Sequence, residues 1–495
     1  MNRGSIEADV CVIVEGAYPY VTGGVASWLQ ELITSLPDLT FSIVAIKANE
    51  EDQPWRTPPP PNVIEVVEVP LSHGPVRRAP SGPAIERIGR LLMEFLSSGS
   101  GDALQALSGE LARLRGSEIA QGIMSSPQMF AILSDYYRET LPASSFHHFF
   151  WAVQILLGGL LSVLRARIPP ARLYHTLSTG FSGLLAARAR LETGRPVFIT
   201  EHGIYLLERQ IEIMMVDWMG NQTQTGLVLE RNSFDLTDLW SAAFQSYARA
   251  CYDACDPIVS LYQANSEVQR RLGAPSERLR IIPNGIRIDR FTEVAPATDH
   301  DAPLVALIGR VVPIKDIKTF IRAAALVHAR CPQARFVVLG PENEDVDYAA
   351  DCHALVEELG LAHVLDFAGR VDVVEWLPRI DILVLTSLSE AQPLVILEAG
   401  ACGIPAIAPD VGSCRELIEG TAANPAAGGI ITALVDPEST AAAIALLVED
   451  AGLRAQMGEI MRERVHREYD WRGIVAQYRD IYADLATRES LAIQD

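Results

Sequence analysis

The feature that most constrains the fold of this chain is a strand–loop–helix pattern over residues 381–405. The run that follows Asp381 is short, apolar and rich in β-branched side chains, which is typical of a strand buried in a parallel sheet. Pro393 has a preset φ and no N–H, so it suits the first turn of a helix, and Gly403 suits the end of that helix. The free backbone N–H groups of such a helix start form a site for an anion; here they belong to Leu394 and Val395.

Two carboxylates flank this predicted helix start. Glu390 precedes it and Glu398 lies within the helix. Eight helical residues span roughly 12 Å, so the pair suits one elongated ligand that is held at both ends and has an anionic group between them. By themselves, however, two glutamates also fit an ordinary loop with one carboxylate on either side.

The same alternation of apolar runs and helical patterns recurs in two series and predicts an α/β protein. We expect one domain over residues 1–295 and a second over 296–470, with a linker rich in Pro, Ala, Asp and Thr at 292–303. Within the first domain the alternation is lost, and helical patterns predict an inserted helical segment over about 82–165. A last helical segment covers 471–495.

Composition narrows the class of protein. The chain has 495 residues and a formal net charge of −21, which argues against nucleic acid or an anionic membrane as its main partner. Its seven cysteines are scattered and fit reduced core residues of a cytosolic protein.

The N-terminus has an acidic pair where a signal peptide needs a basic and then an apolar run. The apolar stretch Phe149–Leu164 is shorter than the ~20 residues of a membrane span, so we expect a buried helix.

Three further loops carry candidate binding residues. Gly23 and Gly24 lie between a strand and a helix, where a phosphate or sugar can approach the backbone, although tight-turn glycines look the same. His202 follows a predicted strand, at the edge where open α/β sheets place ligands, although a histidine whose polar atoms are satisfied within a turn looks the same. Arg310 and Lys315 share one loop after a strand and suit a diphosphate clamp, or else a solvated basic loop.

In their order along the chain, these motifs resemble those of the retaining GT-B-fold glycosyltransferases of family 4. The likeness rests on the Gly-Gly loop and on four motifs: Glu201-His-Gly-Ile-Tyr, Asn284-Gly-Ile, Gly309-Arg-x4-Lys, and Glu390-x7-Glu followed by Ala-x-Ala-x-Gly-x-Pro. It implies a GT-B fold, in which two Rossmann-like domains face each other across a cleft and the second binds a nucleotide sugar. The sequence departs from the common family pattern at Ala391-Gln392, where a Gly and an aromatic or aliphatic residue are usual.

The resemblance also implies roles for individual residues. Glu398 would hold the ribose, and Glu390 and His202 the donor sugar. The diphosphate would bind Arg310, Lys315 and the helix start, and the base would meet the backbone of Arg370 and Val371. The catalytic residues implied are His202, Glu390, Arg310 and Lys315; the binding residues are Gly23, Gly24, Asn284, Arg310, Lys315, Arg370, Val371, Glu390, Pro393, Leu394, Val395 and Glu398.

No metal and no other cofactor is expected. Two Asp-x-Asp strings, Asp299–Asp301 and Asp345–Asp347, could suggest a divalent cation, but both fall in acidic loop stretches where solvated charge explains them.

Within the family, Glu15–Val25, the helical insert and Glu390–Glu398 are similar to the cytosolic glycosyltransferases of Pel exopolysaccharide systems. This implies UDP-glucose or a UDP-N-acetylhexosamine as donor, a polysaccharide acceptor and a membrane synthase complex as partner. It also implies a cytoplasmic location, with recruitment to the inner face of the cell membrane. Two other functions stay open: a sugar-nucleotide 2-epimerase and a non-catalytic UDP-sugar-binding subunit.

Overall fold

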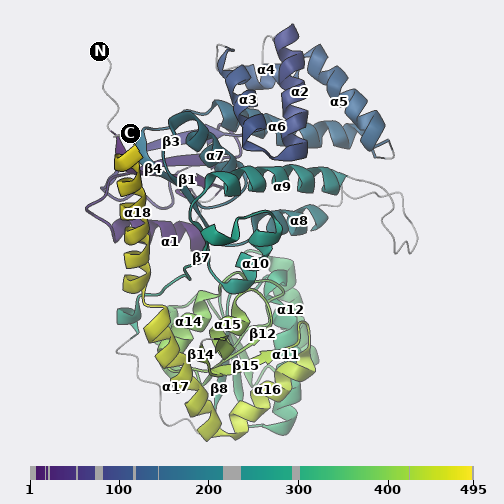
Figure 1. The fold of residues 1–495 in the computed structure, drawn as a ribbon. Helices are drawn as coiled ribbons and strands as arrows, with labels where there is room; N and C mark the ends of the chain where they lie inside the picture. The colour runs from purple at the N-terminus through teal and green to yellow at the C-terminus, as the bar shows by residue number, and fades with distance from the viewer. Residues whose placement is uncertain are drawn as a thin grey trace. The chain divides into compact units, whose positions relative to one another are not determined.

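The computed structural model describes residues 7–16, 18–20, 23–51, 54–72, 82–114, 119–142, 144–215, 236–291, 302–422 and 424–492. The chain divides into two compact units (Figure 1). The first unit comprises Met1–Ser260, Asn265–Ile281 and Tyr478–Asp495, and the second comprises Leu261–Ala264 and Ile282–Gln477. Most of the expected linker, residues 292–301, lies outside the described residues.

The first unit is built on a parallel sheet of seven strands in the order β3-β2-β1-β4-β5-β6-β7. Its strands are β1 Ala8–Glu15, β2 Phe41–Lys47, β3 Val63–Pro70, β4 Ala171–Thr176, β5 Val197–Glu201, β6 Ile258–Ser260 and β7 Leu279–Ile281. Val12 lies opposite Ile43 of β2 and His175 of β4. The strand order reverses between β1 and β4, and open α/β sheets bind ligands beside such a reversal, at the carboxyl ends of the strands.

Helices cover this sheet, and the predicted insert is helical. The covering helices include α1 Gly24–Thr34, α7 Phe181–Thr193, α8 Tyr205–Met215, α9 Leu236–Ala254 and α10 Gln263–Arg271. The insert comprises α2 Pro83–Ser98, α3 Gly101–Ala112, α4 Ile119–Met124, α5 Pro127–Thr140 and α6 Phe146–Arg165, which gather in one cluster in Figure 1. Within the described residues, α6 is long and apolar enough to cross a membrane, but 61% of that window is buried inside the unit. Phe149 and Leu160 of α6 are fully buried in the core, as expected for a core helix.

The second unit has a parallel sheet of six strands in the order β10-β9-β8-β11-β12-β15. Its strands are β8 Leu304–Ile308, β9 Arg335–Leu339, β10 Leu365–Gly369, β11 Ile382–Val384, β12 Ala406–Pro409 and β15 Gly429–Thr432, beside the hairpin of β13 Gly420–Thr421 and β14 Asn424–Pro425. Its helices are α11 Ile317–Arg330, α12 Val346–Glu358, α13 Val373–Trp376, α14 Leu394–Ala401, α15 Cys414–Glu419, α16 Pro437–Glu449 and α17 Ala451–Glu468. Numbered within the unit, the strand order is that of a Rossmann fold. The predicted fold class, α/β with two Rossmann-like domains, is therefore confirmed.

The last helix, α18 Trp471–Ala492, belongs to both units. It begins in the second unit, and from Tyr478 onward it belongs to the first. There the Tyr482 hydroxyl lies 3.0 Å from Nδ1 of His175, and Arg479 forms an ion pair with Asp38.

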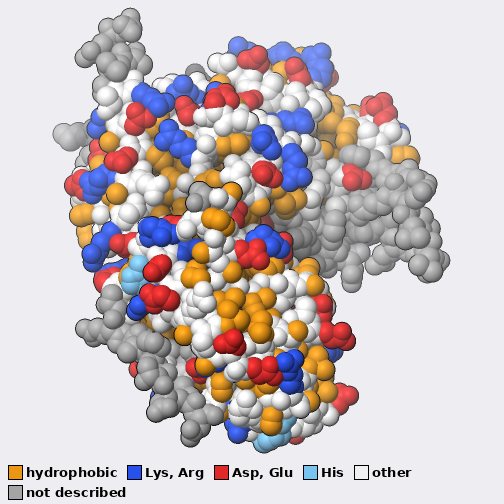
Figure 2. Space-filling model, turned by 60° about the horizontal axis from the view of Figure 1, so that its bottom comes forward, with side chains coloured by type: hydrophobic (Ala, Val, Ile, Leu, Met, Phe, Trp, Pro, Cys, Tyr) orange, Lys and Arg blue, Asp and Glu red, His pale blue; other side chains and the backbone are white. Residues whose placement is uncertain are grey.

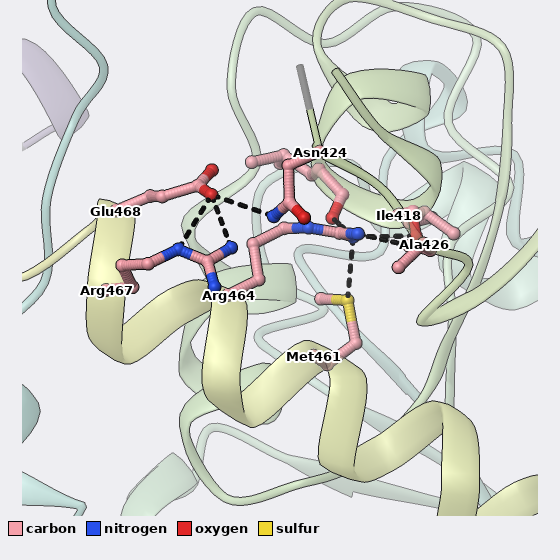
Figure 3. Close-up of polar contacts among 8 residues, drawn as sticks. Ile418, Asn424, Ala426, Met461, Arg464, Arg467 and Glu468 are labelled. Carbon is pink, nitrogen blue, oxygen red and sulfur yellow. Dashed lines mark hydrogen bonds and ion pairs between the residues drawn. The ribbon is translucent and has the colours of Figure 1, made fainter. Parts of the chain in front are cut away.

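Figure 3 shows a buried arginine of α17, Arg464, whose guanidinium bonds backbone carbonyl groups of neighbouring segments. Arg464 is 1% exposed, and its Nη1 donates to the carbonyl oxygens of Leu417 and Ile418, both at 2.8 Å. Its Nη2 donates to the carbonyl oxygen of Ala426. Because the last carbonyls of a helix have no partner within it, these bonds tie the end of α15 and the segment after β14 to α17.

Charged side chains are mixed on the surface. On the face drawn in Figure 2, basic and acidic side chains lie interspersed, so neither sign dominates the described part of that face. The seven cysteines are buried and free.

Candidate functional site

The centre of the candidate site is an ion pair between two predicted residues. Lys315 follows β8 and Glu390 follows β11, and these two strands are neighbours at the reversal of the second sheet. Nζ of Lys315 lies 2.5 Å from Oε1 of Glu390, and the two side chains are 23% and 12% exposed. The sequence predicted both residues, but not that they would meet.

Backbone and hydroxyl contacts join the two loops that carry this pair. The hydroxyl of Thr386 donates to the carbonyl oxygens of Lys315 and Asp316, at 3.0 and 2.9 Å. The N–H of Leu388 donates to the carbonyl oxygen of Ile314 at 2.8 Å. The pair is therefore held between two loops that are fastened to each other.

The helix start is close to the prediction. Pro393 is the N-cap of α14, one residue before the helix, and Cys402 is its C-cap. Gly403 follows with φ +78°, in the left-handed region that glycine favours. Leu394 and Val395 form the first turn and are half-buried. Their N–H groups lack intrahelical partners, as at any helix start, and the macrodipole adds a partial positive charge there.

The departure from the common family pattern has a structural role. The side chain of Gln392 is buried and bonds both backbone groups of Asn284: Oε1 accepts from the Asn284 N–H at 2.8 Å, and Nε2 donates to its carbonyl oxygen at 3.4 Å. Asn284 was predicted to bind nucleotide; in the structure its backbone binds Gln392. The unusual residue at position 392 was visible in the sequence, but its partner Asn284 was not.

A glycine allows the loop of Glu390 to lie close to the next strand end. Gly412 has φ +55°, and a Cβ there would lie 2.1 Å from the carbonyl oxygen of Glu390. The adjacent Ser413 donates its N–H to the carbonyl oxygen of Ala391 at 2.9 Å. Ser413 precedes α15, whose far end is held by Arg464, so the position of Glu390 depends on this part of the core.

Glu398 lies further along α14 and has a charged neighbour. Burial raises the pKa of the Glu398 carboxyl, and the positive charge of Arg290 opposes that effect. Arg290 lies in the short turn Ile288–Arg290 and was not among the predicted site residues. A half-buried carboxylate with one nearby cation can accept hydrogen bonds from a neutral diol.

The remaining predicted residues of this unit lie at neighbouring strand ends. Arg310, after β8, is exposed and forms an ion pair with Glu344 at 2.5 Å. Arg370, after β10, lines a hollow of about 490 Å³ together with residues that follow β9, among them Pro341 and Asn343. Val371 packs against the apolar core. The structure thus places Arg310 and Lys315 on one loop but in separate ion pairs.

The other predicted residues belong to the first unit. Gly23 is the N-cap of α1 and Gly24 its first residue, and both are exposed. His202 directly follows β5 and is 7% exposed. Its ring packs edge-on against Trp28 of α1, with 4.6 Å between centroids. Burial lowers the pKa of His202 to about 4, so the ring is neutral at pH 7. Its Nε2 has no hydrogen-bond partner among the described residues.

In the described part of the chain, no three His, Cys, Asp or Glu side chains gather as they would around a metal ion. Asp345 of one Asp-x-Asp string is the N-cap of α12 and accepts from the Tyr348 N–H at 2.9 Å. The other string, Asp299–Asp301, lies outside the described residues.

Two family models match the chain. Residues 8–277 match "Domain of unknown function (DUF3492)", and residues 290–464 match "Glycosyl transferases group 1". Among curated proteins, D-inositol 3-phosphate glycosyltransferase 2 of Catenulispora acidiphila is 32% identical over 47% of this chain and 56% of its own length. An N-acetylgalactosaminyltransferase of Campylobacter jejuni that acts on a diphospho-undecaprenol compound is 27% identical over 46% and 59%. The chain thus spans only about half the length of these relatives.

Solved structures share the fold over nearly the whole chain. Sucrose-phosphate synthase of Thermosynechococcus elongatus has a TM-score of 0.58 at 17% identity and covers 97% of this chain and 99% of its own. HepE of Anabaena in complex with UDP has a TM-score of 0.59 at 16% identity and covers 96% and 99%. At these identities the likeness concerns the fold alone.

Proposed function

The chain belongs to the family described as the domain of unknown function DUF3492 and carries a group 1 glycosyl transferase domain in a GT-B fold, and from this premise we propose that it is a retaining glycosyltransferase that uses a UDP-sugar. The observation that carries the proposal is the Lys315–Glu390 pair at the strand reversal of the second unit. Lys315 lies on the loop after β8 and Glu390 on the loop that leads from β11 into α14, so a cation, a carboxylate and a helix start come from adjacent strand ends. These are the groups that a sugar diphosphate needs.

In this proposal the donor lies along the carboxyl ends of the strands. The diphosphate binds Arg310, Lys315 and the first turn of α14, and the ribose binds Glu398. The sugar hydroxyls bind Glu390. The nucleotide base lies by Arg370 and Val371, beside the hollow after β9 and β10. HepE of Anabaena, which shares the fold, has been solved with UDP and with UDP-glucose.

The ion pair suggests how binding prepares the reaction. In the structure the Glu390 carboxylate pairs with Nζ of Lys315. The donor diphosphate would take over the Nζ of Lys315, because the diphosphate of a UDP-sugar carries two negative charges and a carboxylate carries one. The released Glu390 then accepts hydroxyl groups of the sugar.

During transfer the bond between the anomeric carbon and the diphosphate oxygen breaks, and the acceptor oxygen bonds to the same face of that carbon. The acceptor proton leaves with the diphosphate. Lys315 and the helix N–H groups stabilise the charge that develops on the departing oxygen, which is the type of effect that contributes most to many enzyme rates. No metal has a part in this scheme.

We extend the proposal to the acceptor and the setting. The acceptor is a growing exopolysaccharide of the Pel type, and the donor is UDP-glucose or a UDP-N-acetylhexosamine. The protein acts in the cytoplasm, beside a membrane synthase complex. This part rests on the likeness of Glu15–Val25 and Glu390–Glu398 to the transferases of those systems.

Calorimetry with UDP in the presence of EDTA tests the donor site. We expect binding without added metal, and we expect Lys315→Met to weaken it. The matched control is Lys318→Met, since Lys318 of α11 also forms an ion pair, 2.8 Å from Asp351 of α12. A strict need for Mg²⁺ or Mn²⁺, or equal loss in both variants, would contradict the proposal. Isomerisation of a UDP-sugar without an acceptor would identify an epimerase instead.

A further inference from the structure

The first unit contains a cavity of about 460 Å³ that none of the predicted site residues lines. It lies at the carboxyl ends of β1, β2 and β3, where Glu15, Ala48 and Leu71 contribute to its wall. Helix α6 of the insert contributes Trp151 and Gln154. The volume falls within the roughly 300–1,000 Å³ of small-molecule sites in proteins. Because it borders the strand reversal between β1 and β4, its position is one where open sheets bind ligands.

One end of the cavity is polar and built around Glu15. The hydroxyl of Tyr205 donates to Oε1 of Glu15 at 2.6 Å, and the N–H of Ser182, at the start of α7, donates to Oε2 at 3.2 Å. Nη2 of Arg209 lies 3.9 Å from the same carboxylate, and its guanidinium lies over the Tyr205 ring, 5.0 Å from the centroid. A carboxylate and a guanidinium thus share this wall.

The other walls are aromatic. Trp240 and Phe244 of α9 lie 5.5 Å apart, and Phe244 lies 5.3 Å from Tyr205, measured between ring centroids. Trp151 is 53% exposed and extends the aromatic lining to the surface of α6. The indole Nε1 of Trp240 is buried and has no hydrogen-bond partner among the described residues. Buried donors of this kind are usually satisfied, so an oxygen of a ligand would complete its hydrogen bonding.

We propose that this cavity binds a saccharide unit of the acceptor. A pyranose ring has apolar C–H faces that pack on aromatic rings, and hydroxyl groups that both donate and accept hydrogen bonds. Glu15, Arg209 and Gln154 offer the acceptors and donors that those hydroxyls need. A hydrocarbon chain would instead leave the buried indole N–H of Trp240 without an acceptor, which is unfavourable. A phosphate would lie against the carboxylate of Glu15.

The assignment of the ligand as acceptor rests on the proposed function, whereas saccharide binding itself does not. The proposed site also assigns a function to the helical insert, because Trp151 and Gln154 of α6 complete the wall of the cavity. The insert would then select the acceptor while the second unit binds the donor.

Methyl NMR of the full chain with labelled methionine separates the two sites. Met124 lines the cavity, whereas Met461 packs against Gly400 of α14 in the second unit. Chitotriose or maltotriose is expected to shift the Met124 methyl signal in a saturable way and to leave that of Met461 in place. UDP is expected to do the reverse. Met124→Leu and Met461→Leu assign the two signals.

Trp151→Ala is the decisive variant, because an exposed side chain can be removed without loss of the fold. We expect it to weaken trisaccharide binding by about fivefold or more and to leave UDP binding unchanged. Phe130→Ala is the matched control, since Phe130 is 48% exposed on α5 of the same insert and does not line the cavity. Glu15→Gln, which keeps the shape of the side chain, should also weaken binding.

Three results would overturn the inference: no response of Met124 to either trisaccharide, a response that survives both Trp151→Ala and Glu15→Gln, or a response to decanol alone. If Met124 responds to a trisaccharide but UDP moves neither methionine and no transfer occurs, the saccharide site stands and the proposed transferase function fails.

Discussion

Replacing Glu390 by Gln tests how the candidate site is built. The substitution keeps the shape of the side chain but removes its charge, so Lys315 loses the ion pair that holds it at 2.5 Å. If UDP must displace Glu390 from Lys315, the variant should bind UDP as tightly as the parent or about fivefold more tightly, a difference of roughly 1 kcal/mol. Its kcat should fall, because Glu390 contacts the sugar in the proposed reaction.

Lys315→Met should have the opposite effect on UDP. A hydrogen bond to a charged group contributes about 1.5–3 kcal/mol, so its loss should raise the Kd about 10- to 150-fold. Calorimetry with UDP measures both variants, and steady-state transfer assays give kcat and KM. The reasoning is refuted if Glu390→Gln weakens UDP as much as Lys315→Met does, because Glu390 would then support nucleotide binding rather than compete with it.

Four further outcomes are expected. Glu398→Ala should weaken UDP and raise the KM for the donor with little change in kcat, since the ribose is the same in ground and transition states; a fall in kcat alone would contradict this. Arg310→Ala should weaken UDP-sugar binding or slow turnover, since it removes a charge-assisted contact to the diphosphate of about 1.5–3 kcal/mol. If calorimetry and kinetics are unchanged, Arg310 only forms its exposed ion pair and does not contact the donor. The pKa of His202 is lowered to about 4, so below the ordinary value of about 6.5 the unfolded chain binds a proton that the folded chain does not. Through this group the free energy of unfolding of the wild type should therefore fall by about 2 kcal/mol between pH 7 and 5. Urea unfolding at the two pH values should show that His202→Gln lacks this contribution. Arg464→Met should cost about 2–4 kcal/mol, because it leaves three carbonyl oxygens without their donor, whereas Arg467→Met, at an exposed ion pair, should stay within about 0.5 kcal/mol.

The local architecture of the site could be predicted from the sequence. An apolar β-branched run, Pro393 and Gly403 specified the strand, the start of α14 and its end, because each acts through the backbone of its own neighbourhood. The loop that carries Arg310 and Lys315 was found in the same way, from its place directly after an apolar run. Two parallel sheets and a helical insert were predicted because the spacing of apolar residues changes along the chain between patterns typical of strands and of helices.

Which of these local features contact one another depends on the tertiary fold. Lys315 and Glu390 are 75 residues apart in the sequence, and they pair because β8 and β11 are neighbours in the sheet. The order of strands is a property of the whole sheet. The alternation of apolar and polar residues along one strand does not show which strands lie beside it. The bond from Gln392 to Asn284 and the cavity around Glu15 arise in the same way, from loops and helices that only packing brings together. The hydrophobic pattern of a segment shows which of its sides is buried, but it does not show which other segment packs against that side.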